Sequence, residues 1–416
     1  MKKKIKRFII ISSIIITTLI IIFISWYSYD IDPIEDKAYL PTPISNPSNH
    51  SNGYTSLLKL DEEFRSNPTK YTPSLFNKIK FEQINDEELF KHPFVKKLPH
   101  RLNEINLDEE YQENILTDYL GKRPYLLSSK YFTDIICKYS LHLWKVNKRH
   151  EALSNLLTID KFINKLRSQR RTYHYFLTVT AMHDALDNTR LEILETKNLT
   201  KDNFQQLLQF QDRPYITSQM RELLKWDYKL SFEYYANNTK GIKRIAYCEN
   251  RTKKFWIDLM FPIFESLNRD ELYLDDKYFI EYSDRIEGYM SDIFSGRNAI
   301  GRMYMSANTP PIYTFLYKIK RMLIKRDIVT IYTYLKQYKF INGKYPVSLD
   351  QLNIDLPKDA WSNYKSEYKY SVKTKKLYSI GSNKLDDSGD YKSESKNGQI
   401  DKIFNHMSPD FGINIK

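Results

Sequence analysis

Glycine and cysteine are scarce in this sequence, and both shortages limit what the protein can be. The chain holds 11 glycines among 416 residues, whereas average usage of roughly 7% would supply more than twice as many. Few glycines leave few phosphate-cradling loops, so a Rossmann or P-loop enzyme is not expected. The two cysteines, Cys137 and Cys248, make neither a disulfide framework nor a four-cysteine metal site. Whether they pair with each other stays open.

The sequence motifs of well-known catalytic sites are also missing. The chain contains no Gly-x-Ser-x-Gly and no His-Glu-x-x-His, and neither cysteine has the flanking residues of a thiol enzyme. His174 and His183 are spaced so that they point to different faces of a helix. The acidic runs at 61–63 and 86–88 would suit a glycosidase, but neighbouring acids usually cap helices or face solvent. We therefore assign no catalytic residues.

A long apolar run near the N-terminus is the strongest positive signal. It begins at Phe8, ends at Ile24, and contains only serine and threonine as polar residues. With Trp26 and Tyr27 as an aromatic belt, it has the length of a membrane-spanning helix. Five basic residues precede it, namely Lys2, Lys3, Lys4, Lys6 and Arg7. By the positive-inside rule, residues 1–7 are a cytoplasmic tail, residues 8–27 are the transmembrane anchor, and the rest of the chain is extracytoplasmic.

Two alternatives to an uncleaved anchor stay open, a cleaved signal peptide and a buried core helix. A signal peptide is cleaved after small residues, whereas the run ends in Phe23-Ile24-Ser25-Trp26-Tyr27-Ser28. The bulky ending favours the anchor. This interpretation predicts a single-pass protein of the bacterial inner membrane, with the lipid bilayer as one partner.

The net charge of +13 does not by itself indicate nucleic acid as a partner. The 64 basic residues are scattered among 51 acidic ones, and no arginine-rich arm, RNP motif or recognition helix is present. A position outside the cytoplasm also separates the chain from nucleic acid. We expect no nucleic-acid binding, while attraction to anionic lipid or cell-wall polymer stays open.

The distribution of proline divides the exported part. Prolines are dense between residues 28 and 104, which predicts a proline-rich stalk with short helices. Between residues 125 and 213 there is no proline or glycine, and apolar residues recur every three or four positions. This pattern predicts helices, with polar joints at 147–149 and 187–189. We expect residues 105–309 to form an all-α bundle or short solenoid, with further helices at 217–236, 253–267 and 275–294.

The pattern changes again after Pro310 and Pro311. Apolar spacing over 313–338 predicts one long amphipathic helix that ends before Gly343. Alternation over 368–373, followed by the run 377–380, predicts an antiparallel hairpin. Residues 312–416 are therefore expected to form a small α+β module, and the fold class of the whole chain is mostly α.

Three motifs in this module resemble the C-terminal domain of the major pseudopilin of type II secretion. The segment from Asp327-Ile328-Val329 to Asn342-Gly343-Lys344-Tyr345-Pro346 resembles the end of the pilin helix. Leu356-Pro357-Lys358-Asp359-Ala360-Trp361-Ser362-Asn363 resembles the Leu-Pro-Lys-Asp-Pro-Trp-Gly-Asn turn, and Leu377-Tyr378-Ser379-Ile380-Gly381 resembles the strand that follows. The peptidase motif of pseudopilins is replaced by Lys6-Arg7-Phe8, so pilin-like processing or polymerisation is not expected.

The chain as a whole is similar to a broad group of bacterial proteins with one N-terminal membrane helix and a helical middle region. The similarity includes Asn52-Gly53-Tyr54 and Asn298-Ala299-Ile300-Gly301-Arg302. That group has no agreed activity, so the resemblance implies an architecture and no reaction.

The pseudopilin resemblance also implies a candidate calcium site in the loop after the second strand. The oxygen-bearing side chains of this region are Asn383, Asp386, Asp387, Asp390 and Asp401. Calcium takes six to eight oxygen ligands, which such residues can supply. However, Asn383-Lys384 replaces the Asp-Gly pair of the family, removing a carboxylate and adding an ammonium group. A solvated polar loop is the alternative.

These features together favour a non-enzymatic scaffold or binding protein of the cell envelope, which holds another envelope protein through the helical domain. One alternative is an accessory component of a secretion or pilus-like machine. Another is an enzyme that processes cell-wall glycan or peptide. A cleft lined by two buried acids would favour the enzyme, and a broad exposed apolar patch would favour the scaffold.

Overall fold

The structure is a computed structural model, which describes most of the chain in separate ranges. These are residues 14–22, 33, 35–41, 53–66, 74–80, 82–107, 124–167, 173–210, 217–238, 248–267, 310–363, 365–381, 386, 388 and 411–415. The described part is mostly helical and carries one small antiparallel sheet. The predicted combination of many helices with a hairpin is thereby confirmed.

Part of the N-terminal apolar run is described as a helix over residues 14–22. Its isoleucine and leucine side chains are 51% to 60% exposed. Among the residues that the structure describes, no helix is both long and apolar enough to cross a bilayer. Phe8, Ile24, Trp26 and Tyr27, which we predicted to bound the anchor, lie outside the described residues.

Four helices occupy much of the region that the sequence predicted as a stalk. They are α2 (Gly53–Arg65), α3 (Leu75–Lys80), α4 (Asp86–Lys91) and α5 (Pro93–Leu107). Apolar side chains such as Leu60 of α2 and Leu98 of α5 are fully buried in the main core. Pro93 is the first residue of α5, where no backbone N–H is needed. Pro99 lies inside α5, where it removes one backbone donor of the helix. The described residues of 53–107 thus include the short helices that were predicted for this region, and these helices pack into the main core.

The helical middle region follows the predicted pattern with one difference. It comprises α6 (Pro124–Lys145), α7 (Arg149–Arg167), α8 (Tyr173–Leu194), α9 (Lys201–Leu207), α10 (Thr217–Asn238) and α11 (Glu249–Ser266). The predicted joint at 147–149 separates α6 from α7, and Asn147 there has φ +65°. The predicted joint at 187–189 instead lies inside α8, where Asp187 is paired with Arg190 of the next turn. The helix expected over 275–294 falls outside the described residues.

The C-terminal module consists of one long helix and three short strands. Helix α14 (Pro310–Asn342) ends where the N–H of Gly343, at φ +73°, donates to the carbonyl of Lys339 over 2.8 Å. A 3₁₀ turn, η3 (Leu349–Leu352), precedes the strands β1 (Lys369–Ser371), β2 (Lys376–Ser379) and β3 (Phe411–Asn414). They form an antiparallel sheet in the order β1-β2-β3.

Strand β3 is an element that the sequence pattern did not predict. Its Gly412 lies opposite Tyr378 of β2. A Cβ atom at position 412 would lie 2.3 Å from the carbonyl oxygen of Leu377 and 2.5 Å from the Cβ of Tyr378. Only glycine therefore allows the two strands to approach this closely.

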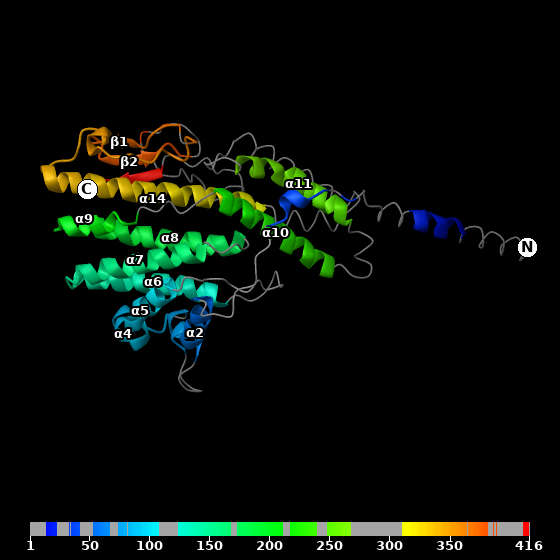
Figure 1. Cartoon of the computed structure of the whole chain (residues 1–416), viewed down its shortest axis with the longest axis horizontal. Coiled ribbons are helices and arrows are strands. Elements are labelled where there is room, and N and C mark those ends of the chain that lie inside the picture. The colour runs from blue at the N-terminus through cyan, green and yellow to red at the C-terminus, as the bar shows by residue number, and fades with distance from the viewer. Residues whose placement is uncertain are drawn as a thin grey trace, which may run out of the picture.

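The elements are stacked in layers, as Figure 1 shows. The sheet lies on α14, α14 lies on α8 and α9, and α6 and α7 separate these from α2–α5. One continuous core runs through these layers, from Tyr54 to Ile415. A second, smaller core lies where α10, α11 and the first half of α14 meet, and includes Trp256 and Ile319.

Candidate functional site

The main core contains a network of buried charged side chains that the helices bring together. Helix α8 contributes His183, Asp187 and Arg190, which share one face because their spacing is i, i+4 and i+7. Helix α7 contributes Asp160, and α14 contributes Arg326. All five side chains are at most 5% exposed. We call these five residues the buried charge network.

Arg326 connects three helices in this network. One terminal nitrogen of its guanidinium donates to Oδ1 of Asp160 over 2.8 Å and to the carbonyl oxygen of Phe210 over 3.3 Å. The other lies 2.9 Å from Nδ1 of His183. Because a guanidinium only donates hydrogen bonds, Nδ1 of His183 is the acceptor. The proton of the neutral imidazole is therefore on Nε2.

Arg190 forms a second buried ion pair in the same network. It donates to Oδ1 of Asp187 over 2.8 Å and to the carbonyl oxygen of Leu207 over 3.3 Å. Its guanidinium lies 4.6 Å from the ring centroid of Phe210. Burial lowers the pKa of Arg190, and the neighbouring carboxylate of Asp187 opposes this shift.

The same surroundings keep His183 uncharged. Burial lowers its pKa well below the usual value, and the positive charges of Arg326 and Arg167 lower it further. A histidine placed against arginines in this way does not bind protons near neutral pH. The network therefore has the properties of a structural tie between α7, α8 and α14.

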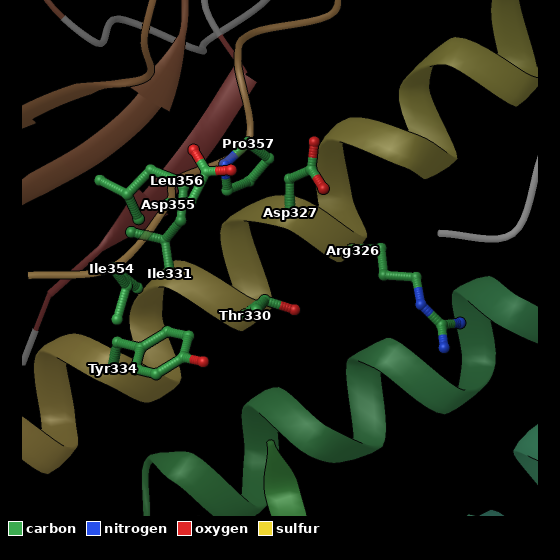
Figure 2. Close-up of a pocket in the computed structure, with 9 residues that line it drawn as sticks. All are labelled: Arg326, Asp327, Thr330, Ile331, Tyr334, Ile354, Asp355, Leu356 and Pro357. Carbon is green, nitrogen blue, oxygen red and sulfur yellow. The ribbon is translucent and has the colours of Figure 1, made fainter. Parts of the chain in front are cut away.

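A pocket lies between α14 and the segment that leads toward the sheet (Figure 2). Its volume is about 280 Å³, slightly below the roughly 300–1,000 Å³ of typical ligand pockets. Asp327 and Asp355 contribute carboxylates, and Oδ2 of Asp327 accepts a hydrogen bond from the hydroxyl of Tyr368 over 2.9 Å. Figure 2 shows Arg326 pointing away from Asp327 and Asp355, toward the neighbouring helices. The other lining residues are Thr330, Ile331, Tyr334, Ile354, Leu356 and Pro357.

The pocket has a chemistry that suits a small cationic group. Its two carboxylates are not buried, because Asp355 is exposed and Asp327 is partly exposed. The buried acids Asp160 and Asp187 belong instead to the charge network. These four acids therefore do not form the cleft with two buried acids that would favour a glycan-cleaving enzyme.

Two of the three motifs behind the pseudopilin resemblance, the turn and the strand, are joined by hydrogen bonds. Asp359 of the turn accepts hydrogen bonds from the N–H of Trp361 (2.9 Å), the hydroxyl of Ser379 (2.8 Å) and the N–H of Ile380 (3.0 Å). Burial raises the pKa of Asp359, and these hydrogen bonds oppose the shift. Lys320 of α14 donates to Oδ1 of Asn363 over 2.9 Å. The turn, the second strand and the long helix are thereby linked.

The predicted calcium site is described at one residue only. Asp386 is exposed, and its Oδ1 accepts hydrogen bonds from the hydroxyl of Tyr378 and the N–H of Ser388, both over 3.0 Å. Asn383, Asp387, Asp390 and Asp401 lie outside the described residues. Within the described ranges, no group of three or more His, Cys, Asp or Glu residues is arranged to hold a metal ion. The calcium site stays a prediction.

Both cysteines are buried free thiols. Burial raises the pKa of Cys137 to about 12, and a thiol that stays protonated is a poor nucleophile. The side chain of His174 lies outside the described residues, whereas His183 belongs to the buried charge network. Cys137 thus lacks the properties of a catalytic thiol.

A segment near the N-terminus is bound to the second core. It contains the 3₁₀ turn η1 (Lys37–Tyr39), which lies beside α11 in Figure 1. The hydroxyl of Tyr228 donates to Oδ2 of Asp36 over 2.7 Å. The ring of Tyr39 lies 5.1 Å from that of Phe264 and 6.0 Å from that of Trp256, in edge-to-face geometry. These contacts fasten the segment to α10 and α11.

Comparison of the chain with protein-family models finds no match, and none is found among curated proteins or solved structures. The pseudopilin resemblance therefore stays a prediction that rests on the three sequence motifs.

Proposed function

We propose that the protein is a membrane-anchored, extracytoplasmic scaffold or binding protein of the bacterial cell envelope. The use of its buried carboxylates carries this proposal. Asp61, Asp160 and Asp187 pair with arginines, and Asp359 binds backbone N–H groups and a serine. Asp160 joins α7 to α14, and Asp359 joins the turn to the second strand. This use of the acids supports the proposal of a rigid protein that holds a partner. We assign no reaction to the protein.

The anchor is proposed to be residues 8–27 in the inner membrane, with the N-terminus in the cytoplasm. The support is the apolar sequence and the exposure of the isoleucines in the helix at 14–22. The contacts of Asp36 and Tyr39 with α10 and α11 would then hold the folded body close to the bilayer.

The partner is proposed to be another envelope protein, bound through the helical region. The test is capture of the full-length protein from crosslinked native membranes, followed by mass spectrometry, with membranes that lack the protein as control. We expect one envelope protein at near-stoichiometric yield. Recovery of no protein above the control would contradict the scaffold.

An accessory role in a secretion or pilus-like machine is the second candidate. The observation that favours it is the linked arrangement of α14, the turn at Asp359 and the second strand. In this case pseudopilins would be the proteins recovered after crosslinking. Their absence, with another envelope protein captured, would remove this candidate.

A cell-wall enzyme is the third candidate, and Asp327 and Asp355, which line the pocket with exposed or partly exposed carboxylates, are the acids to test. The test is incubation of the protein with cell-wall glycan and peptide fragments. Turnover that is lost in both Asp327→Asn and Asp355→Asn would support an enzyme. No turnover by the wild-type protein would exclude these substrates.

Calcium is proposed as a ligand of the loop that contains Asp386. Calorimetric titration of the full-length protein tests it, with Asp386→Asn as the comparison variant. Heat of binding that weakens in the variant supports the site. No heat at millimolar calcium would refute it.

A further inference from the structure

Helix α14 and the loop after it expose bulky apolar side chains at one end of the molecule. Phe340 is 54% exposed, Ile341 66% and Val347 78%. In Figure 1 this end of α14 and the helix at 14–22 lie at opposite ends of the long axis. We call residues 336–349 the α14 tip.

The charge of the α14 tip has a single sign. It contains Lys336, Lys339 and Lys344, and no aspartate or glutamate occurs between residues 336 and 349. Asp350 follows directly, and one of its carboxylate oxygens lies 3.2 Å from the hydroxyl of Ser348. The exposed apolar side chains are therefore surrounded in sequence by positive charge alone.

Hydrogen bonds hold the backbone of the tip in place. The N–H of Gly343 donates to the carbonyl of Lys339, which closes the last turn of α14. The hydroxyl of Tyr370 donates to the carbonyl of Pro346 over 2.9 Å, and the N–H of Val347 donates to Oε1 of Gln351 over 2.7 Å. The backbone that carries the exposed apolar side chains is therefore ordered, and the ring of Phe340, although half exposed, lies 5.7 Å from that of Phe204.

We propose that the α14 tip binds the surface of an anionic lipid bilayer, so that a chain anchored in one membrane contacts a second one. The inference rests on the proposed anchor. Apolar side chains that enter the acyl boundary, beside lysines that meet lipid phosphates, are typical of proteins that bind membrane surfaces. Because the tip lies at the end opposite to the anchor, it would contact a second bilayer and not the one that holds the anchor.

Lipid fits these observations better than a protein partner does. A stable protein interface usually takes about 800 Å² from each partner and has a well-packed centre. Three side chains at the end of α14 and in the loop after it offer much less than this area. A fluid bilayer needs no matching shape, and its phosphates complement the positive charge of the tip lysines.

The experiment uses the full-length protein reconstituted into unlabelled vesicles of phosphatidylcholine. Flotation after alkaline carbonate extraction first measures whether the chain is anchored. Fluorescent vesicles containing phosphatidylglycerol, or phosphatidylcholine alone, are then added, and their capture by the first vesicles is measured. We expect capture of the anionic vesicles at least tenfold above that of the neutral ones, and its loss at high salt.

Two tip variants and two matched controls identify the surface. The triple change of Phe340, Ile341 and Val347 to serine should lower capture at least tenfold, and the change of the three tip lysines to glutamine should remove the preference for anionic lipid. The controls should stay within twofold of the wild type. They change exposed residues elsewhere, in the sets Leu107→Ser, Leu127→Ser, Phe261→Ser and Lys59→Gln, Lys96→Gln, Lys97→Gln. Circular dichroism verifies that every variant is folded.

The outcomes separate this inference from the proposed function. Loss of the chain on carbonate extraction would overturn the anchor and, with it, the contact between two bilayers. An anchored chain that captures no anionic vesicles, or captures them equally well with the tip variants, would overturn the tip proposal alone. In that case an acidic protein becomes the occupant to seek.

Discussion

Replacing Arg326 by methionine removes the side chain that joins α7, α8 and α14. Methionine has a similar length but no charge and no donor. The change deletes the ion pair with Asp160, the hydrogen bond to His183 and the bond to the carbonyl of Phe210. Asp160 is 5% exposed and would lose its ion-pair partner while it stays buried.

The size of the effect follows from this burial. Breaking a buried ion pair by removing one partner costs about 3–5 kcal/mol, so we expect Arg326→Met to lower the free energy of unfolding by about 4 kcal/mol. Adding Asp160→Asn removes the uncompensated charge. The double variant should therefore be destabilised by about 2 kcal/mol less than the sum of the two single changes.

The assay is urea unfolding of the full-length protein in detergent, followed by circular dichroism. Lys325→Met is the matched control, because Lys325 precedes Arg326 and pairs with Asp184; the side chains are 13% and 52% exposed. Because Asp184 stays in contact with water when Lys325 is removed, we expect this change to cost about 1 kcal/mol. Additive effects of the Arg326 and Asp160 changes, or an Arg326→Met variant as stable as the control, would refute the assignment of a coupled buried network.

Three further predictions concern other parts of the fold. Gly412→Ala should destabilise the sheet by about 2 kcal/mol or more, because the new Cβ collides with backbone of β2, as urea unfolding will measure. The pKa of His183 is lowered in the folded state, so the unfolded chain binds the proton first as pH falls. Stability should therefore decrease below about pH 6.5, by up to about 1.4 kcal/mol per pH unit, down to the folded pKa, and His183→Gln should remove this slope. Asp36→Asn should weaken the bond from Tyr228 and speed limited proteolysis of residues 35–41.

Each of these has a result that would contradict it. Unchanged stability of Gly412→Ala would mean that β3 does not pair with β2 at Tyr378. If stability falls equally steeply with pH in the wild type and in His183→Gln, groups other than His183 cause the fall. His92→Gln measures the share of His92, whose pKa is also lowered by burial. Proteolysis of Asp36→Asn at the wild-type rate would show that the contacts of Asp36 with Tyr228 and Lys253 do not hold η1 in place.

Much of the fold could be predicted from periodicity. The absence of proline and glycine over 125–213 indicated helices, and Gly343 marked the end of α14. The density of proline over 28–104 predicted a stalk with short helices, and Leu57, Leu60 and Phe64 of α2 are buried at helical spacing. Proline density alone does not indicate that these apolar faces pack against the main core.

The rest could not be predicted because it depends on contacts between distant segments. Strand β3 has four residues and pairs with β2 across a long stretch of sequence. The buried charge network combines residues that are more than one hundred positions apart, such as Asp160 and Arg326. The signal for Arg326 was weak but present, since it occupies an apolar position of α14 between Met322 and Val329, both buried.

Protease treatment of intact spheroplasts directly tests the proposed topology, in which the N-terminus is cytoplasmic and the rest of the chain after the anchor is extracytoplasmic. The full-length protein carries a tag at each end. We expect external protease to remove the C-terminal tag and to leave the N-terminal tag intact. The protected fragment should stay in the membrane after carbonate extraction. A C-terminal tag that survives in intact spheroplasts, or a chain recovered in the soluble fraction, would contradict it.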